Sequence, residues 1–302
     1  MKMNIQKLRG VVAMVGCCII LLGCEKNVDL NLNQVEDVLV VDAIIENDQP
    51  PVVILTTSLN YFNNINAAIL NNLFIHNAVV KISNGSLTHQ LREVSTPSGL
   101  GFNLYAYTLD PSNSTTAFLG ELNKQYQLKI EVDGKVYEAT THIPSLDKRI
   151  DSLWWKIPTL YSGDDPNKVV VMLKATDPPG LGNYIRYFTK KNSEPFLPGQ
   201  NSTFDDQIID GTTYSLQVDP GIDRNNPIKA DSNYFKKGDT VTFKLSNIDR
   251  DTYRFWNTWE FAAQSIGNPF SQPGKVLGNI SNGALGAFYG YANDFKTIII
   301  PR

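Results

Sequence analysis

The sequence predicts a mainly β protein: an N-terminal β-sandwich of immunoglobulin or transthyretin type, followed by a β-rich C-terminal domain that carries one aromatic helix. Short β-branched runs recur along the chain and are separated by Asn, Asp, Gly and Pro, as in strands joined by turns. Two separators, Asn84-Gly85 and Asp133-Gly134, suit type I′ hairpin turns, which need φ > 0 at two successive residues. The sequence has no repeat of fixed period, so we do not expect a repeat architecture.

The N-terminal sandwich is predicted over residues 37–146. Its opening strands are apolar runs at 38–45 and 52–55. Residues 67–74 form either a short helix or an ordered loop, since the surrounding asparagines favour turns and caps. A later strand has one buried and one solvated face, because its apolar residues alternate with polar ones: Tyr126, Leu128, Ile130 and Val132.

The C-terminal domain is predicted over residues 147–302. Its strands are apolar runs within 150–157, 169–173, 184–188 and 240–245. A helix begins after Asp249 or Asp251, either of which can cap it, and runs to about Ser265. Further along, the spacing of Gly283, Gly286 and Gly290 indicates close backbone approach in a bent strand or a loop that crosses a helix. A phosphate-binding loop is disfavoured, since no helix with Lys and Ser or Thr follows.

Aromatic residues in the C-terminal domain supply the candidate contact residues. One face of the predicted helix carries a stripe that we assign to the core: Phe255, Trp256, Trp259, Ala262, Ala263 and Ile266. Tyr253 and Phe261 fall outside this stripe and are therefore candidates for partner or ligand contacts. Trp154 and Trp155 are candidates too, because adjacent strand residues face opposite ways and at least one must lie at the surface or under a loop.

A lipoprotein signal precedes the folded body. Lys2, Lys7 and Arg9 form a basic n-region, followed by an apolar h-region at 11–22. Twelve residues span only about 18 Å as a helix, whereas a bilayer core is roughly 30 Å thick. The segment therefore predicts a cleaved signal and not a stable membrane anchor.

Cys24 ends this apolar run in Leu21-Leu22-Gly23-Cys24, the arrangement that a lipoprotein signal peptidase requires. A cysteine in such a run can also be a plain hydrophobe, which is how we interpret Cys17 and Cys18. Cys24 differs, because a small residue precedes it and polar chain follows. We predict removal of residues 1–23, acylation of Cys24 with palmitate-type chains, and a polar tether over 24–36.

Composition and motifs argue against several function classes. All three cysteines lie at or before Cys24, so the body has no disulfide and no thiol nucleophile. Signal removal takes three of the 27 basic residues and none of the 30 acidic ones, and a net charge of about −6 disfavours nucleic acid. His76, His89 and His142 form no metal-binding pair, and no hydrolase motif is present. We predict no enzyme activity and no cofactor.

Two acidic groups offer oxygen atoms that calcium would accept. They are Asp205-Asp206 with Asp210, and Asp219 with Asp223. Neither has the ligand spacing or the closing glutamate of an EF-hand. Solvated turns are therefore favoured, and we predict no metal site.

Several segments together resemble a Bacteroidota lipoprotein family known as domain of unknown function 4249. The segments are the lipobox at Cys24, the opening strand 38–45, Ile150-Asp151-Ser152-Leu153, residues 235–241, Tyr253-Arg254-Phe255-Trp256, Gly267-Asn268-Pro269-Phe270 and residues 280–291. They span most of the chain after Cys24. The resemblance implies an outer-membrane lipoprotein, often encoded near TonB-dependent receptors, and supplies no catalytic residues.

Two functions fit these observations. The first is a non-catalytic accessory or solute-binding lipoprotein of the outer membrane, working beside a TonB-dependent transporter. It predicts a concave site near Trp154, Trp155 or the loops at 196–233. The second is a structural or adhesive surface lipoprotein without a small-molecule ligand. For both, the surface face of the membrane is favoured over the periplasmic face.

Overall fold

A computed structural model describes residues 37–59, 66–99, 101–158, 165–224, 233–266 and 274–302. The predicted signal, the predicted acylation site Cys24 and the predicted tether lie outside these residues. Asp37–Arg302 forms one compact unit, which is mainly β as predicted. Within the described residues, no helix is both long and apolar enough to cross a membrane.

The strands, in chain order, are β1 Leu39–Glu46, β2 Val52–Thr57, β3 Val79–Ser83, β4 Thr88–Gln90, β5 Arg92–Pro97, β6 Asn103–Thr108, β7 Lys124–Val132, β8 Lys135–Ile143, β9 Arg149–Lys156, β10 Lys168–Thr176, β11 Tyr184–Lys191, β12 Leu197–Phe204, β13 Thr213–Val218, β14 Phe235–Lys236, β15 Thr240–Ile248 and β16 Leu285–Ile299. The helical segments are α2 Ala67–Leu73, the 3₁₀ turn η1 Pro111–Asn113 and α3 Arg250–Ser265.

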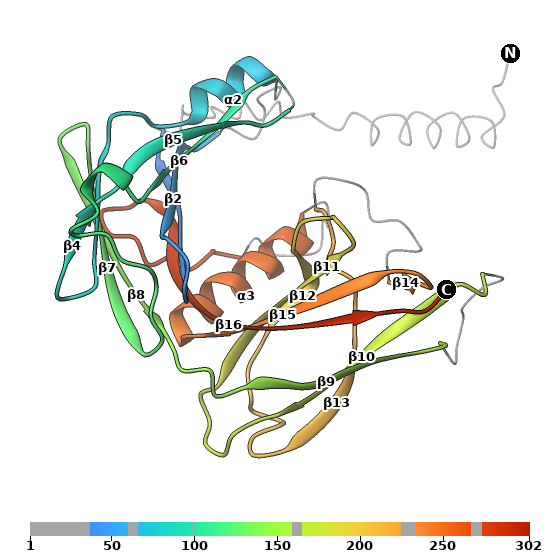
Figure 1. Ribbon diagram of the computed structural model, residues 1–302. Coiled ribbons are helices and arrows are strands. Elements are labelled where there is room, and N and C mark those ends of the chain that lie inside the picture. Colours follow the sequence, from blue (N-terminus) through green and yellow to red (C-terminus); the bar gives the residue numbers. More distant parts are fainter. Residues whose placement is uncertain (1–36, 60–65, 100, 159–164, 225–232, 267–273) are drawn as a thin grey trace, which may run out of the picture. The chain divides into compact units, whose positions relative to one another are not determined.

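One eight-stranded sheet runs through the whole unit, in the order β12-β11-β15-β16-β1-β2-β6-β5 (Figure 1). Its strands come from both sides of residue 146, where we placed a domain boundary. That boundary coincides with the connection between β8 and β9, but the first strand β1 pairs in parallel with the last strand β16. The two predicted segments therefore share a backbone hydrogen-bond ladder.

At one end of this sheet lies the predicted N-terminal sandwich. A second sheet, β4-β3-β7-β8, faces β1 and β2 across a core of alternating apolar residues, which includes Val41, Val53, Ile82 and Leu128. In β7 the predicted alternation is confirmed, since Tyr126, Leu128 and Ile130 are buried. The ambiguous segment after Asn66 is a helix, α2, and the Asn66 side chain caps it by accepting from the Ile69 amide.

The two predicted hairpin turns have different outcomes. Asp133 and Gly134 both have φ > 0, at 51° and 72°, and form the tight β7–β8 turn as predicted. The type I′ turn at Asn84-Gly85 is wrong, because only Gly85 has φ > 0. The β3–β4 loop is longer, and the Asn84 side chain accepts from the amides of Ser86 and Leu87, which closes the loop by a local side-chain bond.

At the other end of the sheet, a four-stranded sheet built from β9, β10, β13 and β14 packs on β11 and β15. The core between them contains Leu173, Ile185, Val218, Phe243 and Leu245. The strands of this second sandwich lie far apart in the chain. Residues from several segments therefore line the pocket between its sheets.

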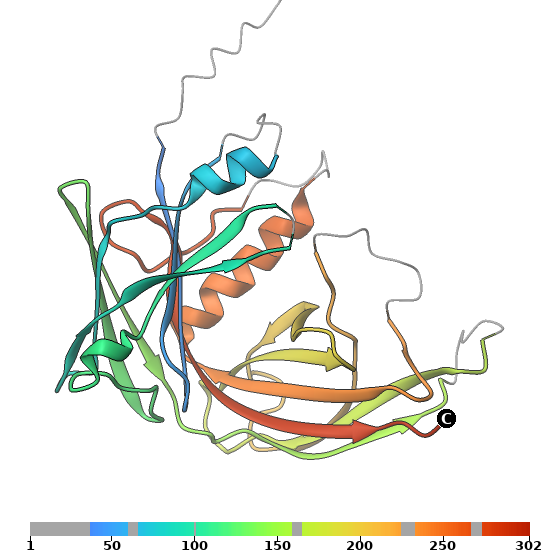
Figure 2. The same ribbon diagram turned by 45° about the horizontal axis from the view of Figure 1, so that its top comes forward.

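Helix α3 lies on β11, β12 and β16 (Figures 1 and 2). Its N-cap is Asp249, whose side chain accepts from the Thr252 amide. Phe255 is buried, and Trp256 and Trp259 pack against the same cluster, so the core assignment of these three is confirmed. The stripe is wrong at Ile266, which is 73% exposed just beyond the helix end.

Strand β16 explains the glycine spacing. Residues 287–292 are all buried, because Phe288 and Ala292 face the N-terminal core while Tyr289 and Tyr291 face α3. A strand covered on both faces loses the usual polar alternation. Gly286 has φ 92°, and a Cβ there would lie 1.9 Å from the Val41 carbonyl oxygen, so close backbone approach in a strand is confirmed.

Candidate functional site

A pocket of about 560 Å³ opens between β13 and the strands β11 and β12. Its floor is apolar, since Leu173, Ile185, Val218 and Phe243 belong to the core of the second sandwich. A volume of this size is within the range of small-molecule sites. The loops and strands around it, from residue 200 to 219, overlap the 196–233 region where a concave site was predicted.

Aromatic rings line the pocket in a layered arrangement. Tyr187 stacks between Phe243 and Phe204, with ring centroids 5.5 Å and 6.2 Å away. Tyr214 and Tyr253 add two more rings to the lining. Gly199 makes room for the Tyr187 hydroxyl, because a Cβ at this position would lie 1.9 Å from that oxygen. The pocket therefore offers flat apolar surfaces to a ligand.

Two carboxylates stand in the lining beside these rings. Asp205 accepts from the Tyr253 hydroxyl at 3.4 Å, and Asp219 accepts from the side-chain amide of Gln217 at 3.3 Å. Both donors are neutral. Among the described residues that line the pocket, none is Lys, Arg or His. The titratable groups of the lining are thus carboxylates and tyrosine hydroxyls.

Burial first, and nearby carboxylates second, raise the pKa values of the three tyrosine hydroxyls in the lining. Burial raises the pKa of Tyr187 well above its usual value, and the charges of Asp219 and Glu260 raise it further. Burial, with Asp177 and Asp151, raises the pKa of Tyr214 to about 12. For Tyr253, burial and Asp205 raise the pKa. All three hydroxyls stay protonated at neutral pH and can act as hydrogen-bond donors.

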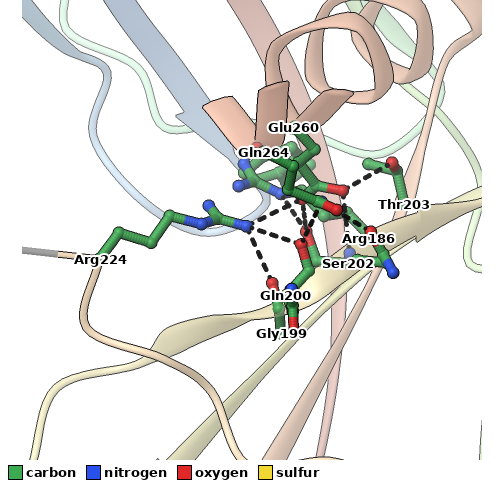
Figure 3. A network of polar contacts seen from close by, with 10 residues as sticks. Arg186, Gly199, Gln200, Ser202, Thr203, Arg224, Glu260 and Gln264 are labelled. Atoms are coloured by element: carbon green, nitrogen blue, oxygen red, sulfur yellow. Dashed lines mark hydrogen bonds and ion pairs between the residues drawn. The ribbon is translucent and has the colours of Figure 1, made fainter. Parts of the chain in front are cut away.

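Behind the pocket, a buried polar network joins α3 to β12 (Figure 3). Glu260 reaches from α3 and accepts from the Ser202 amide at 3.0 Å, from the Ser202 hydroxyl and from the Thr203 hydroxyl at 3.3 Å. Arg224 lies 3.5 Å from the same carboxylate and donates to the carbonyls of Gly199 and Gln200. The network fixes β12, which supplies part of the pocket wall.

Arg186 completes this network from β11. Its Nε donates to the Ser202 hydroxyl at 3.1 Å, and its Nη1 donates to the Tyr291 hydroxyl at 2.8 Å. The guanidinium lies over the Trp256 ring, 3.4 Å from the centroid, a cation–π contact. A buried arginine that is held on so many sides is a positioning group for the strands and α3.

The acidic residues that we weighed for calcium are arranged differently from the expectation. Asp206 and Asp210 gather with Asp177, while Asp205 and Asp219 belong to the pocket. Asp206 is buried and not solvated, since it accepts from the amides of Gly182 and Asn183. Lys148 forms a buried ion pair with Asp177. Lys148 thus offsets one of the three negative charges, and backbone amides donate to the other two carboxylates.

The four candidate contact residues are dispersed. Tyr253 lines the pocket and stacks on Tyr184 at 4.8 Å. Phe261 is 62% exposed on α3, with Gly274 close to its ring. Trp154 on β9 is 36% exposed, whereas Trp155 packs on the second sandwich, as the alternation predicts. Only Tyr253 of the four belongs to the pocket.

Several residues of the site were not singled out from the sequence: Tyr187, Phe204, Tyr214, Phe243, Arg186 and Glu260. Two of them left a signal. Arg186 sits inside the apolar run Tyr184–Phe188, and Glu260 lies between Trp259 and Ala262, at the edge of the apolar stripe of α3. A charged residue at a buried position needs a partner, so each predicts a buried network even though the partner cannot be named.

The fold and the site together define a mainly β protein with a pocket lined by aromatic and acidic side chains. Residues 25–297 match the family described as domain of unknown function (DUF4249), and the chain belongs to this family. No curated protein matches the chain.

Proposed function

We propose that this protein is a non-catalytic, solute-binding accessory lipoprotein of the outer membrane, acting beside a TonB-dependent transporter. The observation that carries solute binding is the pocket between β13, β11 and β12, with its stacked rings Tyr187, Phe204 and Phe243. An apolar concave site with a few placed polar groups is the usual form of a small-molecule site. A spacer or adhesive protein, the alternative, has no need of such a pocket.

Anchorage in this proposal rests on Cys24 and the lipobox before it. Cells grown with an alkyne analogue of palmitate should label the wild-type protein and the Cys18→Ala variant, which is the matched control. The Cys24→Ala variant should lose the label. Label that persists on Cys24→Ala would contradict lipidation at this residue.

The partner is tested on the intact protein. Affinity purification from detergent-solubilised membranes, followed by mass spectrometry, should recover a large TonB-dependent β-barrel receptor. Protease treatment of whole cells should degrade the protein if it faces the outside. Recovery of no barrel, together with no ligand for the pocket, would favour the structural or adhesive role.

A further inference from the structure

We infer that the pocket selects amphiphilic organic cations, meaning small molecules with a flat apolar body and one ammonium group, over anions of the same shape. This inference rests on the proposed solute-binding function and names its ligand class. Two observations support it: the lining contains stacked aromatic rings, and its charged side chains are the carboxylates of Asp205 and Asp219.

The interior of the pocket favours a flat apolar body. Leu173, Ile185 and Phe243 form its floor, and Tyr187 and Phe204 continue the stack of rings toward the more exposed side. Burial of an aromatic ring against such a wall removes apolar surface from water on both partners. The same ring faces attract a cation within about 6 Å of their centroids.

The charged groups of the lining then decide the sign of the ligand. Asp219 is exposed and Asp205 is half-buried, so both carboxylates stand where the pocket meets solvent. Within the part of the chain that the structure describes, neither forms an ion pair with Lys, Arg or His. An ammonium group would gain a partner at this position, whereas a ligand carboxylate would meet two like charges.

Two cations close to the pocket, among the residues that the structure describes, do not offset this field for a ligand. Arg224 is committed to Glu260 and to the carbonyls of Gly199 and Gln200. Lys148, which lies 6.0 Å from the Tyr214 ring centroid, is paired with buried Asp177. To pair with either of these two groups, an anionic ligand would have to break an existing ion pair, and that cost would lower the affinity of anions but not of cations.

The test compares three probes that share one ring system and differ in charge. Tryptamine is a cation, tryptophol is neutral and indole-3-acetate is an anion at pH 7. Isothermal titration of the purified full-length protein should show tryptamine binding at least about tenfold more tightly than indole-3-acetate, with tryptophol between them.

Removal of the two charges should remove the discrimination. In the double variant Asp205→Asn with Asp219→Asn, we expect the affinity ratio of tryptamine to indole-3-acetate to fall to within about threefold. Asp133→Asn loses one carboxylate in the β7–β8 turn, away from the pocket, and should keep the wild-type ratio. As a measurement on the unaltered protein, rising ionic strength should shrink the ratio, because exposed charges are screened.

The outcomes separate this inference from the proposed function. Tighter binding of tryptophol or indole-3-acetate would overturn cation selection while solute binding stands. A ratio that survives in the double variant would also overturn it. If none of the three probes binds, the inference fails, and solute binding is then judged separately by the ligands and receptor that accompany the protein from its own membranes.

Discussion

A buried carboxylate is costly unless hydrogen bonds and a counter-charge surround it, and Glu260 shows how this chain meets that requirement. Its oxygens take hydrogen bonds from Ser202 and Thr203, with Arg224 beside them, and Arg186 is tied to the same Ser202 hydroxyl. Glu260 lies on α3, Ser202 on β12 and Arg186 on β11, so the contacts join three elements. Loss of one of these side chains should therefore lower the free energy of unfolding by more than one hydrogen bond contributes.

Glu260→Ala should lower the free energy of unfolding by about 3 kcal/mol, because it leaves the Ser202 amide and Arg224 without their buried acceptor. Urea denaturation at pH 7 measures this. Glu121→Ala is the control, since Glu121 pairs with Lys124 at the surface and should cost less than about 1 kcal/mol. Equal losses of unfolding free energy in the two variants would show that the buried network contributes no more to stability than the surface ion pair.

His89 gives the protein a pH-dependent contribution to stability. It is buried, its Nε2 accepts from the Asp110 amide at 3.0 Å, and desolvation lowers its pKa below the ordinary 6.5. Between these two pKa values the unfolded chain binds more protons than the folded one. The contribution is therefore complete above pH 6.5 and is lost as pH falls toward the lowered pKa.

Comparison of the wild type with His89→Gln should reveal this dependence. The difference in unfolding free energy between the two should shrink below pH 6.5, with a slope of at most about 1.4 kcal/mol per pH unit. Subtraction removes the contributions of the other titrating groups. A difference that stays constant from pH 8 to pH 5 would contradict a neutral buried His89.

At the scale of elements, local patterns predicted structure well and distant pairings escaped them. The β7–β8 hairpin and the capped helix α3 follow from a few adjacent residues, such as Asp133-Gly134 and Asp249. The parallel pairing of β1 with β16 does not, because the two strands lie far apart in the chain: Asp42 on β1 and Tyr289 on β16, whose side chains share a hydrogen bond, are 247 positions apart. The 196–233 region and Tyr253 were predicted, but the full set of rings that lines the pocket was not, because these rings come from β11, β12, β13, β15 and α3.

Two glycines allow a matched comparison of substitutions: Gly286 lies in β16, and Gly283 lies two residues before this strand begins. Both have φ > 0, but a Cβ at Gly283 meets open space, whereas one at Gly286 meets the Val41 carbonyl. Asparagine tolerates the left-handed region better than most residues. Gly283→Asn should thus change stability by less than about 1 kcal/mol, and Gly286→Asn should cost more than about 3 kcal/mol.

Thermal or urea unfolding of both variants checks this prediction. The ladder between β1 and β16 must part to admit the new side chain at 286, so soluble yield should fall as well. Similar stabilities for the two variants would mean that the strands separate more easily than the pairing indicates.

At the scale of the whole molecule, the shared sheet makes folding of the two predicted domains interdependent. Residues 37–146 include β1 but not its neighbour β16, and residues 147–302 include β16 but not β1. Each half alone would expose an unpaired strand edge and an uncovered core face.

We expect neither half alone to give a cooperative unfolding transition, and we expect the two halves, when co-expressed, to associate into a complex with one transition. Circular dichroism with urea titration and size-exclusion chromatography measure these outcomes. A residue 37–146 fragment that unfolds cooperatively by itself would show that the N-terminal sandwich is an independent domain.

Because β16 lies between β15 and β1 in the eight-stranded sheet, its late synthesis limits how early the sheet can form. Among the described strands, β1 emerges first during synthesis, yet its parallel neighbour β16 emerges last. Pairings between such distant segments close slowly, because the entropy of a long loop is lost before the contacts form. A nascent chain of this kind cannot complete its eight-stranded sheet until β16 arrives, so the apolar faces of the earlier strands stay partly uncovered until synthesis has passed residue 299.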